Sequence, residues 1–211
     1  MTLPPMRTSI SRRAGAVAAV VALALVLGAC SSSSKPGATG ICSSSAEPGS
    51  PGTTTAKYAK DTAKILNGGL QKQRAGNIPD AEKDFKEVIK RDPNNTYAYY
   101  DLGLICQNQK KNAEAETAYR RAIAIDPKFE VALYNLGILR ANANDVNGAI
   151  DLYRKAIAAN AKDPNAHFNL GLLLRGQKKT QEGNAEVQTA VNLDPSLRPK
   201  AIAQGVPLTG S

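Results

Sequence analysis

Apolar residues in positions 56–195 recur at the three- and four-residue spacing of amphipathic helices. The stretches 97–104 and 113–123 both show this spacing, with charged and amide residues between the apolar ones. Asp-Pro pairs at 92–93, 126–127 and 194–195 come after such stretches, and proline cannot continue a helix. The pattern predicts pairs of short helices joined by turns, and therefore an all-α fold.

The helical pattern repeats with a period of 34 residues, which is the signature of a solenoid. Four columns keep strict register over four copies: Gly69, Gly103, Gly137 and Gly171; Ala81, Ala115, Ala149 and Gly183; Phe85, Tyr119, Tyr153 and Val187; Val88, Ala122, Ala156 and Ala190. Small residues let two helices approach closely, and we expect the aromatic column to wedge between one pair and the next.

These columns resemble the tetratricopeptide repeat, whose small, aromatic and proline positions correspond in the second copy to Gly103, Ala115, Tyr119, Ala122 and Pro127. The resemblance implies a right-handed superhelical solenoid of about four helix-turn-helix repeats. The domain is expected at 56–195, with a C-terminal cap or tail at 196–211. Its repeats fall at about 62–95, 96–129, 130–163 and 164–197.

Three departures from the repeat pattern carry further expectations. The first copy has Gly68 and Lys72 at positions that are usually Leu and aromatic, so we expect its first helix to begin earlier, at Thr55 or Ala56. In the third copy Asp163-Pro164 suits an N-cap and first helical residue. The last copy is more polar, as the end of a solenoid requires, and residues 199–204 add one further turn.

The N-terminal residues are typical of an export signal. A basic region with Arg12 and Arg13 precedes the apolar run 14–27, which is shorter than the ~20 residues that span a bilayer. The ending Leu27-Gly28-Ala29-Cys30 resembles the bacterial lipobox. That resemblance implies that the signal peptide 1–29 is cleaved and that Cys30 receives a diacylglycerol. The alternative is an ordinary secreted protein with a chance cysteine at the cleavage site.

Residues 30–55 are rich in Ser, Gly and Pro and hold too few large apolar residues to fold. We expect a flexible tether that carries the lipid anchor. Cys42 lies in this tether, and it either pairs between molecules or is incidental. The expected product is an exported, membrane-anchored lipoprotein facing the extracytoplasmic side.

Charge and chemistry favour binding over catalysis. The net charge is 27 − 18 = +9, but it is spread along the chain instead of forming the concentrated basic stripe that nucleic acid requires. The single histidine, His167, falls at a packing position of its helix. Cys106 is expected to be a small core residue, and no disulfide framework or metal-ligand spacing is visible. We therefore expect no enzyme activity, no metal and no cofactor beyond the lipid on Cys30.

The family resemblance also implies a binding surface, because first-helix residues of these repeats line a concave groove. Asn135 and Asn169 occupy a position from which family members often hydrogen-bond a peptide backbone. Leu66 and Leu70 replace the Lys and Asn of the carboxylate clamp, which disfavours acidic peptide tails. The groove residues are expected to be Leu66, Leu70, Tyr97, Tyr100, Leu104, Tyr134, Asn135, Ile138, Phe168, Asn169, Leu172 and Arg175.

The leading hypothesis is a non-catalytic scaffold of the bacterial cell envelope that captures an apolar or aromatic segment of a protein partner. One alternative is an accessory lipoprotein that holds a glycan or small ligand. Another is a homo-oligomer in which self-association through the same face is the function. A further possibility is that the tether or the C-terminal tail of the protein itself covers part of the groove.

Overall fold

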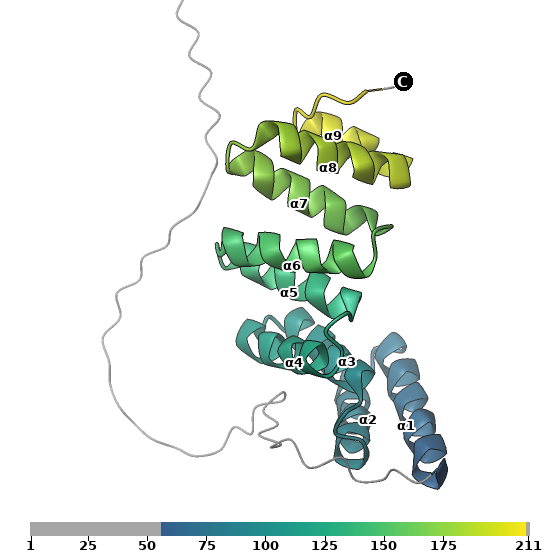
Figure 1. Cartoon of the computed structure of the whole chain (residues 1–211). Helices are drawn as coiled ribbons and strands as arrows, with labels where there is room; N and C mark the ends of the chain where they lie inside the picture. The colour runs from purple at the N-terminus through teal and green to yellow at the C-terminus, as the bar shows by residue number, and fades with distance from the viewer. Residues whose placement is uncertain (1–55, 210–211) are drawn as a thin grey trace, which may run out of the picture. The chain divides into compact units, whose positions relative to one another are not determined.

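The structure is a computed structural model that describes residues 56–209, and across them the chain is helical, with no strand. Consecutive helices form four pairs that succeed one another in chain order (Figure 1). The helices are α1 (Ala56–Arg74), α2 (Ile78–Arg91), α3 (Thr96–Asn108), α4 (Asn112–Ile125), α5 (Glu130–Asn142), α6 (Val146–Ala159), α7 (Pro164–Gly176), α8 (Thr180–Leu193) and α9 (Arg198–Ala203). The all-α prediction is confirmed, and α1 extends back to Ala56, the first described residue, so it reaches well before residue 62 as expected.

The helix ends are set by local side-chain chemistry. Asp163 caps α7, because its carboxylate accepts from the backbone N–H of Asn165 at 2.9 Å, and Pro164 is the first helical residue. Asn95 caps α3 in the same way, accepting from the Ala98 N–H at 3.0 Å. Each Asp-Pro pair stands directly after the last residue of α2, α4 or α8, which confirms these predicted stops.

The turns inside the four pairs share one backbone conformation. A residue with positive φ stands at the same register in each: Gly76 (78°), Lys110 (61°), Asn144 (63°) and Lys178 (65°). This left-handed region is costly for residues with a Cβ, and only the first turn uses glycine. The 34-residue period therefore holds in the backbone as well as in the side chains.

Close packing within each pair explains the glycine column. A Cβ placed on Gly103 would lie 2.5 Å from the Tyr119 ring, so the aromatic column packs against the glycine of its own repeat. The fourth pair is tighter still. A Cβ on Gly171 would lie 2.6 Å from the backbone oxygen of Gly183, which explains the second glycine at that position.

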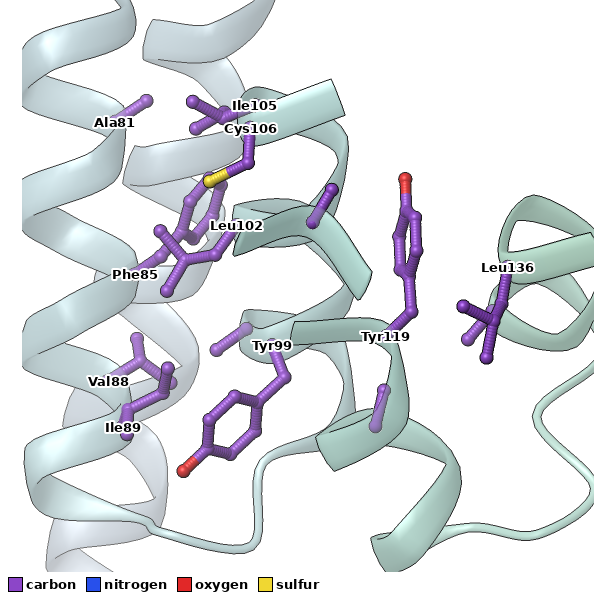
Figure 2. Close-up of a cluster of buried hydrophobic side chains, with 14 of the residues drawn as sticks. Ala81, Phe85, Val88, Ile89, Tyr99, Leu102, Ile105, Cys106, Tyr119 and Leu136 are labelled. Carbon is purple, nitrogen blue, oxygen red and sulfur yellow. The ribbon is translucent and has the colours of Figure 1, made fainter. Parts of the chain in front are cut away.

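The core runs between successive pairs. Phe85, Leu102 and Ile105 are buried together between α2 and α3 (Figure 2). Tyr119 of α4 is also fully buried, and Figure 2 shows its ring between α3 and Leu136 of α5. The aromatic column thus also fills the space toward the next pair, as the sequence predicted.

Cys106 is completely buried in this core, as predicted, with its sulfur beside Phe85 (Figure 2). The sulfur is disulfide-bonded, a bond that the sequence analysis did not predict for Cys106. The sequence signal failed because the cysteines are few and widely spaced. Cys30 and Cys42 lie outside the described residues, together with the predicted signal peptide and tether.

A short 3-10 helix (Pro195–Leu197) and α9 come after α8, which confirms the predicted extra turn. Gly205 continues the glycine column 34 residues after Gly171, but its φ of 65° ends the segment there. The C-terminal segment, residues 195–209, is therefore the beginning of a fifth first helix that stops early. Among residues 56–209, no helix is both long and apolar enough to span a bilayer.

Candidate functional site

An aromatic cluster is the most exposed apolar feature of the first helices of the repeats. These helices, α1, α3, α5 and α7, are called A helices here, and the surface they form is the A-helix surface. Tyr97 is 60% exposed and meets the Phe129 ring edge-on, with centroids 5.3 Å apart. Tyr100 packs edge-on against the same ring at 5.5 Å. Tyr97, Tyr100 and Phe129 form the aromatic cluster, which combines apolar ring area with tyrosine hydroxyl groups.

Phe129 joins the cluster because of its place in the repeat. It stands at the residue before α5, where Asn95 and Asp163 cap the equivalent helices with their side chains. Phe129 makes no side-chain cap, and its ring instead packs on the tyrosines of α3. Sequence analysis missed this residue, although the 34-residue register shows an aromatic where two copies have a capping residue.

Polar contacts link successive A helices. The Asn135 amide of α5 donates to the Tyr100 hydroxyl at 3.4 Å, and the Asn169 amide of α7 donates to the Tyr134 hydroxyl at 3.1 Å. Burial raises the pKa of both Tyr100 and Tyr134, so these phenols stay protonated and retain a proton to donate. The two asparagines thus hold the tyrosines in place.

The acidic groups of this surface lie close to the tyrosines. Asp101 of α3 is 6% exposed, and burial raises the pKa of its carboxyl to about 7. Burial also raises the pKa of Glu130 at the start of α5, and a hydrogen bond with Asp163 raises it further. Sequence analysis missed Asp101 as well, although it stands in register with Asn135 and Asn169.

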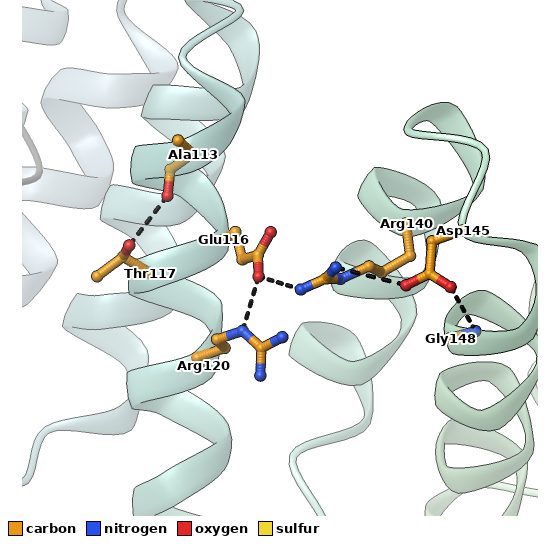
Figure 3. Close-up of polar contacts among 7 residues, drawn as sticks. All are labelled: Ala113, Glu116, Thr117, Arg120, Arg140, Asp145 and Gly148. Carbon is orange, nitrogen blue, oxygen red and sulfur yellow. Dashed lines mark hydrogen bonds and ion pairs between the residues drawn. The ribbon is translucent and has the colours of Figure 1, made fainter.

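The basic residue of α5 is already engaged. Arg140 pairs with Glu116 of α4 and lies 3.4 Å from the Asp145 carboxylate (Figure 3). Arg120 also binds Glu116, at 2.8 Å, and Asp145 caps α6 by accepting from the Gly148 N–H at 3.0 Å. Arg140 is therefore already paired with acidic groups of α4 and of the turn before α6.

Comparisons with known proteins agree with this geometry. A family model described as tetratricopeptide repeat matches residues 66–128, and a second, described as TPR repeat, matches residues 139–177. The chain carries a tetratricopeptide-repeat (TPR) solenoid. No curated protein matches its sequence.

Solved TPR-containing structures share this fold. The crystal structure of MamA is similar over 67% of this chain and 87% of its own, with 24% identity and a TM-score of 0.58. A structure titled for the functional characterization of Pseudomonas aeruginosa PilF has 20% identity and a TM-score of 0.59, covering 66% of this chain and 64% of its own. An O-GlcNAc transferase mutant of Thermobaculum terrenum matches 65% of this chain but only 27% of its own, with 24% identity and a TM-score of 0.58.

The TPR register places most predicted groove residues on the first three A helices. Leu66, Leu70 and Leu104 are partly buried against the core of the first two repeats. Ile138 and Tyr134 pack similarly in the third repeat. All five keep some surface, so the prediction that they line a binding groove stays a prediction.

In the fourth TPR, one predicted groove residue, Phe168, is not on the surface. Phe168 is 1% exposed, because Ala201 and Val206 of the C-terminal segment pack over it together with the α8 core, and Leu172 lies against the same cluster. Arg175 is not open either, since it donates to Asn184 and, at 3.0 Å, to the Gly205 carbonyl. The expected alternative, that the protein's own tail covers part of the groove, is therefore correct at this end.

The remaining candidates for chemistry serve structure. His167 is buried, and its ring nitrogens lie 2.6 Å from a Glu186 carboxylate oxygen and 3.1 Å from the Ala161 carbonyl. On α2, Glu82 pairs with Lys86 at 2.7 Å, the i,i+4 contact that stabilises helices. Within residues 56–209 no group of three or more potential ligand side chains is placed to hold a metal ion.

Proposed function

We propose that this protein is a non-catalytic scaffold, anchored by lipid on the outer side of a bacterial membrane, that binds a segment of a partner protein on the A-helix surface. The proposal rests mainly on the aromatic cluster, in which the exposed Tyr97 packs against Phe129, and Phe129 packs in turn against Tyr100. Exposed aromatic residues on a rigid base are typical of the few residues that supply most binding energy at interfaces.

Rigidity supports this interpretation of the surface. Asn135 fixes the Tyr100 hydroxyl, and Phe129 is held at its helix start, so little side-chain freedom remains to be lost on binding. Tyr97 adds area without being part of the core. The C-terminal segment packs over Phe168 on the fourth A helix, whereas the aromatic cluster on the second and third A helices carries no such cover.

Export is supported by two independent features. The lipobox-like end of the signal sequence places Cys30 at the expected cleavage site. Cys106 is disulfide-bonded, and disulfides persist mainly in oxidising compartments outside the cytoplasm.

Capture of the partner from solubilised envelope tests the binding surface. Tyr97→Ala should reduce the recovered partner at least about fivefold, which corresponds to the ~1 kcal/mol expected for losing an aromatic contact. Ile202→Ala is a matched control, because Ile202 is 61% exposed on α9 and equally apolar at the surface. If the Ile202 variant loses capture while the Tyr97 variant captures the partner normally, the partner binds at the C-terminal end and not on the aromatic cluster.

Metabolic labelling with a fatty acid tests the anchor. The parent chain should take up the label and sediment with membranes, whereas Cys30→Ala should lose the label and remain uncut or leave the membrane fraction. The control is Ser43→Ala, which changes a residue of the expected tether without touching the lipobox or any cysteine. Equal labelling of the parent and the Cys30 variant would refute lipidation at that residue.

A further inference from the structure

The register shared by Asp101, Asn135 and Asn169 shows what residues at this position do. Asn135 on α5 donates to Tyr100 on α3, and Asn169 on α7 donates to Tyr134 on α5. In both cases the side chain faces the A helix of the preceding repeat and binds the residue one position before it in register. Asp101 stands at the same position on α3 and so faces α1.

Between α1 and α3, no tyrosine hydroxyl is present to pair with Asp101. The residue of α1 in register with Tyr100 is Leu66, which has no hydroxyl group. Within residues 56–209 the Asp101 carboxylate has neither a hydrogen-bond donor nor an ion-pair partner, although the residue is only 6% exposed. Every described side-chain oxygen or nitrogen that is sealed from solvent has a partner. The Asp101 oxygens are therefore not sealed, and a donor from outside can reach them.

The surroundings leave this carboxyl uncompensated. Burial alone accounts for its raised pKa, and no cation opposes that effect. The Asp101 charge in turn raises the pKa of Tyr100, so the two groups share one electrostatic environment. Helix α3 contains no Lys or Arg, and no cation of α1, such as Lys60 or Lys64, lowers the pKa of Asp101. Lys72 of α1 pairs with Asp84 at 2.6 Å, and Arg140 and Arg175 of the later A helices are bound elsewhere. A buried carboxylate without donors is a strong acceptor that lacks its ligand.

We infer that Asp101 receives the cationic side chain of a lysine or arginine in the bound partner segment. A charge-assisted hydrogen bond is the contact that best offsets the burial of a carboxylate. The neighbouring Leu66 and Leu70 offer apolar surface for the stem of such a side chain, and the aromatic cluster lies on the same helix as Asp101. This inference rests on the proposed function and specifies it: the partner segment is apolar or aromatic with one basic residue.

Selection from a random library of twelve-residue peptides displayed on phage tests this inference. The immobilised bait is the full chain purified in detergent. On the parent protein, recovered peptides should be rich in apolar residues and show at least about fivefold enrichment of Lys or Arg at one position. On Asp101→Asn the apolar preference should remain and the basic enrichment should disappear. Asp151→Asn, an exposed carboxylate on α6, is the matched control and should behave as the parent.

Affinity measurements on one recovered peptide complete the test. Replacing its basic residue with Gln should weaken binding to the parent about tenfold or more, and to the Asp101→Asn variant less than about twofold. Equal basic enrichment on parent and Asp101→Asn, or selection of apolar peptides without a basic residue, overturns the inference alone. No selection on the parent above that on Tyr97→Ala overturns the proposed function itself. A melting curve checks that the Asp101→Asn variant is folded. We expect it to fold, because Asn occupies the same register position in α5 and α7.

Discussion

Tyr100, Tyr134 and Phe168 occupy the same register position on α3, α5 and α7, yet their surroundings differ. The two tyrosines are half-buried and are held by an asparagine of the next A helix. Phe168 has no complete A helix after it, and the C-terminal segment folds over its ring, with the Lys200 ammonium 4.7 Å from the ring centroid. The end of a solenoid needs such a cover, because its last repeat would otherwise expose its core.

This difference shows that repeat register alone does not determine which residues of the A helices stay exposed. Equivalent residues become core or open surface according to whether a complete A helix or a short terminal segment comes next in the chain. In the second and third repeats the A-helix surface keeps the aromatic cluster exposed, whereas in the fourth the C-terminal segment covers Phe168. Substitutions and truncations in each region can therefore break or sharpen the contrast between them.

Removing the cover should give the largest effect. Deleting residues 198–211 removes Val206 and exposes Phe168, two large buried side chains. At ~1.5 to 3 kcal/mol for each, we expect a loss of ~3 to 6 kcal/mol of unfolding free energy. Urea unfolding measures this loss. Ile202→Ser on the same helix is exposed and should change stability by less than about 0.5 kcal/mol. If the truncated chain unfolds as the parent does, the segment is not a structural cover.

Gly171→Ala should be the next most damaging change. The added methyl group would meet the backbone of α8 at Gly183 and Val187, which cannot rotate away, so a cost of ~1 to 3 kcal/mol is expected. Gly176→Ala is the control, because it stands at the end of the same helix with open space around it and should be neutral or slightly stabilising. Thermal melting compares the two, and equal shifts would contradict the close approach of α7 and α8.

The pH dependence of stability should differ between Asp101→Asn and the parent, and this difference tests whether the Asp101 carboxyl is buried as described. The folded-state pKa of Asp101, about 7, is above its ordinary value of 3.8, so the folded chain binds this proton more tightly than the unfolded chain does. Its contribution is fully present below about pH 4 and is lost as the pH rises toward 7. Relative to the parent, the Asn variant should therefore gain at least ~1 kcal/mol between pH 4 and pH 8. An unchanged difference over that range would show that the carboxyl is well solvated.

The smallest effect concerns a feature that both regions share. Lys110→Gly and Lys178→Gly relieve the same positive-φ conformation in the second and fourth turns, so each should stabilise the chain by about 0.5 to 1 kcal/mol. Equal gains in unfolding free energy, measured by chemical unfolding, would indicate that the second and fourth repeats have the same turn conformation. The two repeats would then differ only in the C-terminal segment that packs on the fourth. Opposite signs would contradict the common backbone register.

The fold was predictable because its determinants are local and periodic. The glycine and aromatic columns, the Asp-Pro stops and the Asp163 cap each act within one repeat, so the sequence displays them directly. The site was only partly predictable. The repeat register does not predict that Val206 packs against Phe168. It also does not predict that Phe129, at a position where other copies cap the helix, packs on Tyr97 instead. These contacts join residues of different repeats, and their outcome depends on the packing of the whole segment.

Site-specific cross-linking in intact cells tests most directly whether the open A-helix surface is the working surface. A photoreactive amino acid is placed at Tyr97 in one variant and at Ile202 in another, since both positions are exposed and their replacement should spare the fold. The account predicts a discrete cross-linked partner from position 97, its yield reduced in the Phe129→Asn background, and none from position 202. A partner captured at position 202 but not at position 97 would contradict it.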